Sequence, residues 1–208
     1  MQNKLLASIV LTASTLSGSF LYAQKNNTGS YGIELSVTPL SAVNIGPFQN
    51  LFGSGSHDSK HYISGLVRGT YKYTDRWSFS MGLGYSSQKV TTTSALVNPD
   101  VEQRTYFSRL QIWEVPLEAR LAFLKYFYAS AGPMLHVQQH SNGYVDKQNG
   151  LGLHIGVGTR ISLSQTIVVS LAPHYKLYSL IPFHAGKYYD RIQTVGVEMG
   201  VSYTLSKH

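Results

Sequence analysis

The clearest pattern in the chain is an alternation of apolar and polar residues near its C-terminal end, between Arg191 and Leu205. Six apolar residues stand at every second position of this stretch: Val195, Val197, Met199, Val201, Tyr203 and Leu205. The residues between them are glycine, serine, threonine and one glutamate. A period of two indicates a β-strand with one apolar and one polar face. Such a strand suits a barrel wall with lipid outside and a narrow polar lumen inside.

The same alternation recurs along most of the chain. It predicts strands over residues 32–40, 61–73, 77–88, 106–123, 127–138, 151–163, 166–178 and 191–205. The connections alternate in length: residues 41–60, 89–104, 139–149 and 179–190 form long loops, whereas residues 74–76, 124–126 and 164–165 form tight turns. In outer-membrane barrels the short turns are periplasmic and the long loops extracellular. The sequence therefore predicts an all-β, eight-stranded, antiparallel, up-and-down transmembrane β-barrel with both termini in the periplasm.

One predicted strand departs from the simple alternation. In the strand over residues 106–123, Leu110 and Ile112 fall on the polar face. Arg109 and Gln111 fall on the apolar face of the same strand. A β-bulge, or projection of this part of the strand beyond the bilayer, would explain the exchange.

The charged residues at mid-strand positions indicate which face is inside. Nine of them share the polar face: Glu34, Arg68, Lys72, Glu114, Glu118, Arg120, Arg160, Lys176 and Glu198. A soluble eight-stranded barrel of the lipocalin kind would instead turn its apolar face inward, around a ligand. The face opposite the charges is uncharged in mid-strand and edged with aromatic residues, and a soluble protein could not display it to water without losing solubility. We therefore expect lipid outside and the nine charges in the lumen.

The N-terminus has the features of a secretory signal peptide. Lys4 supplies a positive charge, an apolar run extends from Leu5 to Val10, and the small residue Ala23 ends the segment. We expect cleavage after Ala23, so that residues 1–23 are a signal peptide and residues 24–208 form one outer-membrane barrel domain. The alternative is an N-terminal membrane anchor, but the apolar run is short and polar residues interrupt it. The chain has no cysteine, which excludes both a lipoprotein anchor and a disulfide framework.

The terminal strand carries a possible recognition signal. Glu198, Gly200, Tyr203 and Leu205 follow the spacing polar, x, Gly, x, x, aromatic, x, hydrophobic. This spacing resembles the signal that the barrel insertion machinery of the outer membrane reads. Residues 206–208 follow the last apolar residue, whereas many barrels end at an aromatic one, and we expect this difference to weaken recognition slightly.

Three segments resemble the small Gram-negative outer-membrane barrel families of the OmpX-like and PorT-like kind. They are residues 114–117 (EVPL), 128–133 (YASAGP) and 200–205 (GVSYTL). The resemblance covers most of the chain after the signal peptide, and it implies the barrel architecture and an outer-membrane location. It implies no particular role, because these families include barrels with unrelated functions.

The lumenal charges allow three functional hypotheses. An eight-stranded barrel is only wide enough for its own side chains, so four carboxylates and five cations should pair and plug the lumen. The protein would then be a non-enzymatic surface or structural protein. The second hypothesis is a narrow channel for ions or small solutes, whose selectivity the charges set. The third is a lipid-modifying enzyme using His154 or His174 with Ser162 or Ser170, although serine is abundant on every inward face.

No motif defines a catalytic, cofactor or metal site. His57 and His61 flank Asp58, but no third ligand lies nearby in the sequence. Gly150 and Gly152 begin a dinucleotide fingerprint that no predicted helix follows. The formal net charge of +7 does not indicate nucleic-acid binding either, because the basic residues form no cluster along the sequence. We therefore predict no cofactor and no bound metal.

The long loops are the remaining candidates for function. Their charges nearly balance, and the last loop, residues 179–190, is rich in aromatic residues. Mixed polar and aromatic loops on a rigid barrel suit contact with a surface partner or with lipopolysaccharide. We predict a monomer of the bacterial outer membrane that contacts membrane lipid, lipopolysaccharide, the insertion machinery and, through its loops, a surface partner.

Overall fold

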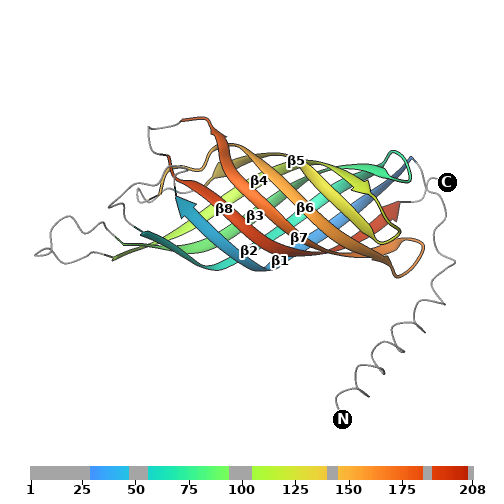
Figure 1. Ribbon diagram of the computed structural model, residues 1–208, viewed down its shortest axis with the longest axis horizontal. Coiled ribbons are helices and arrows are strands. Elements are labelled where there is room, and N and C mark those ends of the chain that lie inside the picture. Colours follow the sequence, from blue (N-terminus) through green and yellow to red (C-terminus); the bar gives the residue numbers. More distant parts are fainter. Residues whose placement is uncertain (1–28, 47–55, 94–104, 140–144, 185–188, 206–208) are drawn as a thin grey trace, which may run out of the picture.

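Every strand of the structure pairs with the next strand along the chain, and the last strand pairs with the first. The computed structural model describes residues 29–46, 56–93, 105–139, 145–184 and 189–205. The strands of this described part are β1 (Ser30–Gly46), β2 (Ser56–Lys72), β3 (Trp77–Thr93), β4 (Thr105–Ala122), β5 (Phe127–Gln138), β6 (Gly150–Ser162), β7 (Ile167–Pro182) and β8 (Arg191–Leu205). All neighbours are antiparallel, and β8 closes the barrel against β1 (Figure 1). The predicted fold class is confirmed.

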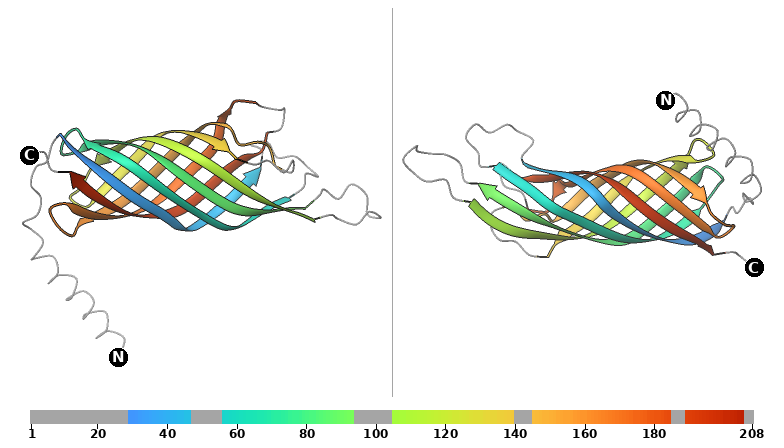
Figure 2. Two further views of the ribbon diagram at one scale, coloured as in Figure 1. Left: turned by 180° about the vertical axis from the view of Figure 1, so that it is seen from behind. Right: turned by 90° about the horizontal axis from the view of Figure 1, so that it is seen from below.

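The two ends of the barrel differ in their connections. Tight turns join β2 to β3, β4 to β5 and β6 to β7 at one end, defined here as the turn end; the opposite end is the loop end. Tyr31 of β1 pairs with Leu205 of β8 at the turn end, so both ends of the described chain lie there (Figure 2). Hydroxyl groups fix two of the turns, because Thr74 and Ser164 accept hydrogen bonds from the backbone amides of the strands that follow. The described residues contain no helix that is long and apolar enough to cross a membrane.

Four strands extend further at the loop end than the apolar pattern predicts. β1 continues to Gly46, β3 to Thr93 and β7 to Pro182, and β2 already begins at Ser56. Beyond the bilayer the outer face of a strand meets water, so apolar alternation fades while backbone pairing continues. The predicted loops over residues 41–60, 89–104 and 179–190 therefore include strand residues, and that part of the prediction is wrong.

The exchange of faces in β4 does not arise from a bulge. β3 and β4 keep one register along their whole paired length. Leu110 and Ile112 point into the lumen and are 3% and 2% exposed. Arg109 is exposed on the outside, directly opposite Lys89 of β3. An outward pair of cations belongs above the hydrocarbon core, which favours the second explanation, projection of this part of β4 beyond the bilayer.

Register shifts occur at other places near the loop end. They lie between Val37 and Leu40, between Lys60 and Ile63, and in β7 opposite the segment from Leu151 to Leu153. In β7, Ser179 has a positive φ of 52°. The irregularity allows Tyr178 and Ser179, although consecutive, both to be buried in the lumen, at 1% and 0% exposure.

The outer face of the barrel is apolar. Leu35, Val67 and Leu83, on three neighbouring strands, are each more than half exposed. Exposed aromatic residues gather near the turn end: Tyr31, Tyr73, Trp77, Phe79, Phe123, Phe127 and Tyr203. An uncharged, aromatic-edged face around a closed barrel is stable in lipid and not in water.

Small residues on the inward face make room for the lumenal charges. A Cβ atom at Gly82 would lie 2.8 Å from Cγ of Arg68, and a Cβ atom at Gly84 would lie 2.8 Å from Cγ of Glu114. Both positions therefore require glycine because a large buried side chain from a neighbouring strand fills the space. The polar face of the sequence pattern is thus a packed interior.

Candidate functional site in the barrel lumen

Arg68 of β2 is the centre of the lumenal charge network. Its side chain is 1% exposed and contacts three carboxylates. Nη1 lies 2.7 Å from Oε1 of Glu34, and Nη2 lies 3.1 Å from Oε1 of Glu118. Glu198 accepts two hydrogen bonds from the same guanidinium, at 2.5 and 2.9 Å. A planar, permanently charged donor is therefore shared by residues of β1, β4 and β8.

Arg120 of β4 extends this network toward the turn end. Its Nη1 donates to Oε2 of Glu34 at 2.6 Å, and its Nε lies 3.4 Å from Oε2 of Glu118. The guanidinium also lies over the ring of Tyr128, 5.6 Å from its centroid. Glu34 is thus bridged by two arginines, which offsets the cost of burying its charge.

A second charged group lies nearer the loop end. Nζ of Lys176 in β7 donates to Oε1 of Glu114 at 2.5 Å, and the hydroxyl of Tyr178 donates to Oε2 of the same carboxylate at 2.8 Å. Glu114 is 1% exposed and Lys176 is 2% exposed. Both oxygens of this buried carboxylate therefore have donors.

The remaining two predicted lumenal cations lie outside these networks. Lys72 is paired with Asp75 of the adjacent turn at 3.2 Å. Arg160 lines a polar recess of about 170 Å³ that opens at the turn end, together with Lys72 and Arg120. No carboxylate within the described ranges forms an ion pair with Arg160. The lumen therefore ends in a mouth lined by cations.

An apolar cluster fills the lumen at the loop end. Its members come from most strands and from the segment before β6: Ile45, Val90, Leu110, Ile112, Met134, Val145, Tyr178 and Ile192. Gln148, which is fully buried, ties this segment down, because its backbone amide donates to Gln138 and its side-chain amide donates to the carbonyl oxygens of Asp146 and Asp190. This cluster was not predicted, although its signal in the sequence was a set of apolar residues at inward positions of the predicted strands: Leu110, Ile112, Met134 and Ile192.

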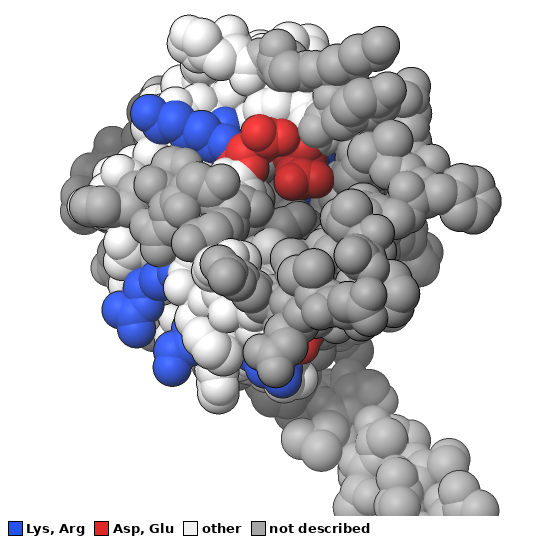
Figure 3. Space-filling view, turned by 90° about the vertical axis from the view of Figure 1, so that its left-hand side faces the viewer, with Lys and Arg blue, Asp and Glu red and all other residues white. Residues whose placement is uncertain are grey.

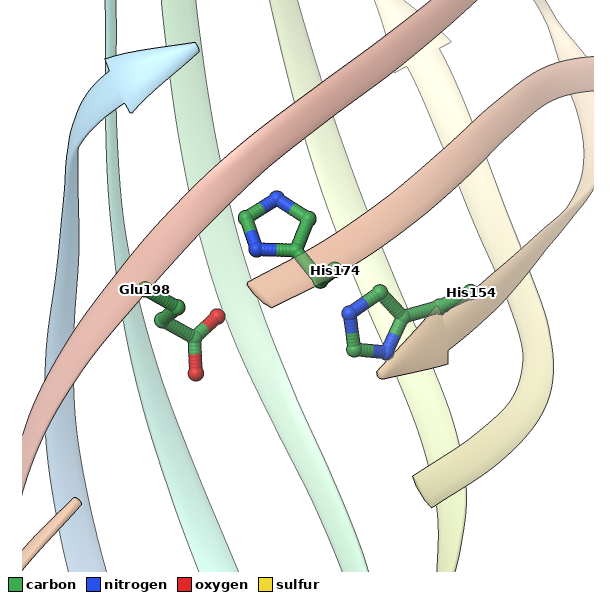
Figure 4. A group of neighbouring side chains, drawn as sticks. All are labelled: His154, His174 and Glu198. Carbon is green, nitrogen blue, oxygen red and sulfur yellow. The ribbon is translucent and has the colours of Figure 1, made fainter. Parts of the chain in front are cut away.

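Two histidines lie beside the charge network without hydrogen-bond partners. His154 of β6 and His174 of β7 are 3% and 4% exposed, and none of their ring nitrogens makes a hydrogen bond to a described residue. Nδ1 of His154 is 3.0 Å from Oε1 of Glu118, although the two groups are not aligned as donor and acceptor. Figure 4 shows both rings and the Glu198 carboxylate turned toward one another in the interior. These three residues are the candidate metal ligands of the described part.

Other sequence candidates do not assemble into sites in the described part. His154 and His174 bond neither Ser162 nor Ser170, so neither of these two serines is activated by a histidine. Asp58 is paired with Lys60 at 3.4 Å, both side chains being largely exposed, and the side chain of His57 lies outside the described residues.

The proposed insertion signal lies on β8. Tyr203 and Leu205 are exposed on the outer face, whereas Glu198 and Gly200 face the lumen. Residues 1–28, which include the predicted signal peptide, and residues 206–208 lie outside the described residues.

Solved structures with similar folds are outer-membrane barrels. The outer membrane protein OprG from Pseudomonas aeruginosa superposes with a TM-score of 0.54 at 11% identity, over 88% of this chain and 98% of that one. The outer membrane protein AlkL, determined in DMPC lipid bilayers, has a TM-score of 0.53 at 12% identity, over 88% of this chain and 93% of that one. No family model and no curated protein matches the sequence. The chain is therefore an eight-stranded β-barrel of the outer-membrane type.

Proposed function

We propose that the protein is an integral outer-membrane barrel, exported by a cleaved signal peptide, that acts as a monomeric and non-enzymatic surface or structural protein. The observation that supports the proposal is that charged and apolar side chains fill the described lumen. Along β4 the inward residues pass from Arg120 and Glu118, through Glu114, to Ile112 and Leu110 at the loop end. The charged members are bonded across the lumen, and the apolar members are packed into the loop-end cluster. A barrel whose lumen is filled in this way would act through its outer face and its loops.

Conductance tests this proposal directly. Residues 24–208 would be refolded in detergent, shown to be folded by a shift in gel mobility on heating, and inserted into a planar bilayer. We expect no reproducible current steps. Steps of constant size from a folded sample would contradict the closed lumen.

The cation-lined mouth favours a narrow channel as the second candidate function. If the apolar cluster opens, Arg120 and Arg160 would face the ion path and attract anions. Arg160→Ala would then lower the preference for anions. In a closed barrel the same substitution would produce no current steps across the bilayer. It would also cost little stability, because Arg160 lies at the open mouth without an ion pair to a described carboxylate.

A row of outward cations supports contact with lipopolysaccharide. Lys60 of β2 is opposite Lys89 of β3, and Lys89 is opposite Arg109 of β4. All three are exposed and lie at the loop end, where the outer leaflet would end. Seen from that end, basic side chains lie at several places around the rim of the barrel (Figure 3). Three adjacent cations on a barrel wall suit the phosphate groups of an anionic glycolipid.

The row can be tested with a matched charge change. Replacing Lys60, Lys89 and Arg109 together by alanine should weaken binding to lipopolysaccharide by about 100-fold, at about 1 kcal/mol for each cation near an anionic surface. The control replaces Lys72, Arg76 and Lys125, which lie at the turn end, and removes the same charge. The readout is the amount of lipopolysaccharide that co-purifies with each variant. Equal losses of bound lipopolysaccharide in the two variants would reject a local site.

A surface partner that binds through the last loop requires a narrower test than removal of residues 179–190. Ser179 is buried and its backbone amide donates to Nε2 of His136 at 2.9 Å, so its removal would disturb the lumen. Deleting residues 183–188 instead should leave the heat-dependent gel shift intact and abolish binding to the surface partner. Retained binding in the deletion variant would reject a role for this loop.

A further inference from the structure

His154, His174 and Glu198 bring three metal-binding groups together inside the barrel. They come from three consecutive strands, β6, β7 and β8, and each can offer one ligand atom, these atoms lying within 4.8 Å of one another. The two imidazole centroids are 5.5 Å apart. Figure 4 shows His174 between the other two side chains. A pair of imidazoles with one carboxylate is the ligand chemistry of zinc and of related divalent transition metals.

The hydrogen bonding of the two histidines indicates that something else belongs between them. The large majority of buried side-chain polar atoms in folded proteins have a hydrogen-bond partner. His136, in the same lumen, has partners at both ring nitrogens: Nε2 accepts from Ser179 and Nδ1 lies 3.4 Å from the carbonyl oxygen of Met134. No ring nitrogen of His154 or His174 has an aligned hydrogen-bond partner among the described residues, although Nδ1 of His154 lies 3.0 Å from Oε1 of Glu118. His136 thus has hydrogen-bond partners in the same lumen in which His154 and His174 lack aligned partners among the described residues.

The surrounding charge favours a cation. The buried networks contain four carboxylates, on Glu34, Glu114, Glu118 and Glu198, and three cations, on Arg68, Arg120 and Lys176. With neutral imidazoles, four negative and three positive charges leave one negative charge in excess within these buried networks, because Lys72 and Arg160 lie outside them at the turn-end mouth. A positive ion at the histidines would lie beside the two carboxylates nearest to them, Glu118 and Glu198.

We propose that His154, His174 and Glu198 form a binding site for a divalent transition-metal ion, zinc being the probe, in the closed lumen. Ligand atoms around zinc lie about 2.0–2.2 Å from the metal, so small side-chain rotations must bring the three groups closer together. Glu118 is placed to hold the ring of His154 by accepting from its Nδ1, as carboxylates commonly do for metal-bound histidines. Arg68 already orients Glu198. The site would cross-link the last three strands of the barrel.

The experiment measures zinc in the full-length barrel without a histidine tag. Protein isolated from membranes would be unfolded with a chelator, refolded in detergent with or without Zn²⁺, dialysed, and analysed for metal by mass spectrometry. We expect one zinc per folded chain. His154→Gln and His174→Gln should each weaken zinc binding by roughly 100-fold or more. The matched control is His136→Gln, which removes a buried lumenal imidazole outside the site and should keep one zinc.

Three outcomes would overturn the proposal. The first is wild-type barrel without zinc, and the second is equal zinc content in the wild type and the double variant of His154 and His174. If these variants do not fold, the X-ray absorption spectrum at the zinc edge of the wild-type protein decides between the explanations, because the site requires two imidazole ligands and an oxygen ligand. The third overturning outcome is a spectrum that lacks the two imidazole ligands. A proton shared by the two rings is the competing explanation, and it predicts pH-dependent stability with no bound zinc.

Discussion

The two halves of the lumen are filled by different chemistry. Toward the turn end, Arg68 and Arg120 bind three carboxylates, which come from β1, β4 and β8. Toward the loop end, eight apolar side chains pack together with no ionised group among them. Both halves fill the lumen with described side chains. Directional ion pairs and hydrogen bonds stabilise the charged half, whereas close packing stabilises the apolar half. Losing one member of the charged half should therefore cost more than losing one member of the apolar half.

The largest effect is expected from Arg68→Met. The substitution leaves Glu198 without the two hydrogen bonds from Arg68. It also removes the contacts that Arg68 makes with Glu34 and Glu118. Breaking a buried ion pair by removing one partner costs about 3–5 kcal/mol. Urea unfolding of the refolded barrel in lipid vesicles would measure the loss. A loss below that of the apolar substitution described next would invert the comparison.

A smaller loss is expected from Ile112→Ala in the apolar half. Ile112 is 2% exposed in the loop-end cluster, and truncation of a buried isoleucine to alanine costs about 2–5 kcal/mol, the lower end applying where neighbours can relax. The flexible side chain of Met134 in the same cluster can move into the vacated space, so we expect a value near the lower end. The same urea-unfolding assay would measure this loss. The control is Leu117→Ala, on the lipid-facing side of β4.

The pair of Glu114 and Lys176 tests whether charged groups act as units. Each single substitution, Glu114→Gln or Lys176→Met, leaves a buried charge without its partner. The double variant should be more stable than the sum of the two losses predicts, with a coupling energy of about 1–3 kcal/mol. Additive losses would show that the two residues do not depend on each other.

The smallest effect is expected at the mouth. Lys72 pairs with Asp75, whose side chain is 54% exposed, and exposed pairs contribute about 0–1 kcal/mol. The free energy of unfolding of Lys72→Ala should therefore lie within about 1 kcal/mol of the wild-type value. A loss comparable to that of Arg68→Met would mean that the charged half extends to the turn end.

The strands over the bilayer followed directly from the sequence. β5 and β8 have the predicted bounds, because lipid on one side and a polar lumen on the other impose a period of two on the residues between. The inward positions of Glu34, Arg68 and Glu198 follow from the same period. Where that environment ends, the period ends as well, so the extensions of β1, β3 and β7 carry no regular alternation of apolar and polar residues.

The pairing of residues across the barrel was decided only by the tertiary structure. Lys60, Lys89 and Arg109 are isolated in the sequence and become neighbours through strand register. The sharing of Arg68 among three carboxylates and the meeting of His154, His174 and Glu198 depend on barrel closure and strand tilt. Alternation along one strand fixes which face a side chain takes. It carries no information on which side chain from another strand it will meet, because that depends on register, bulges and the narrowness of the lumen.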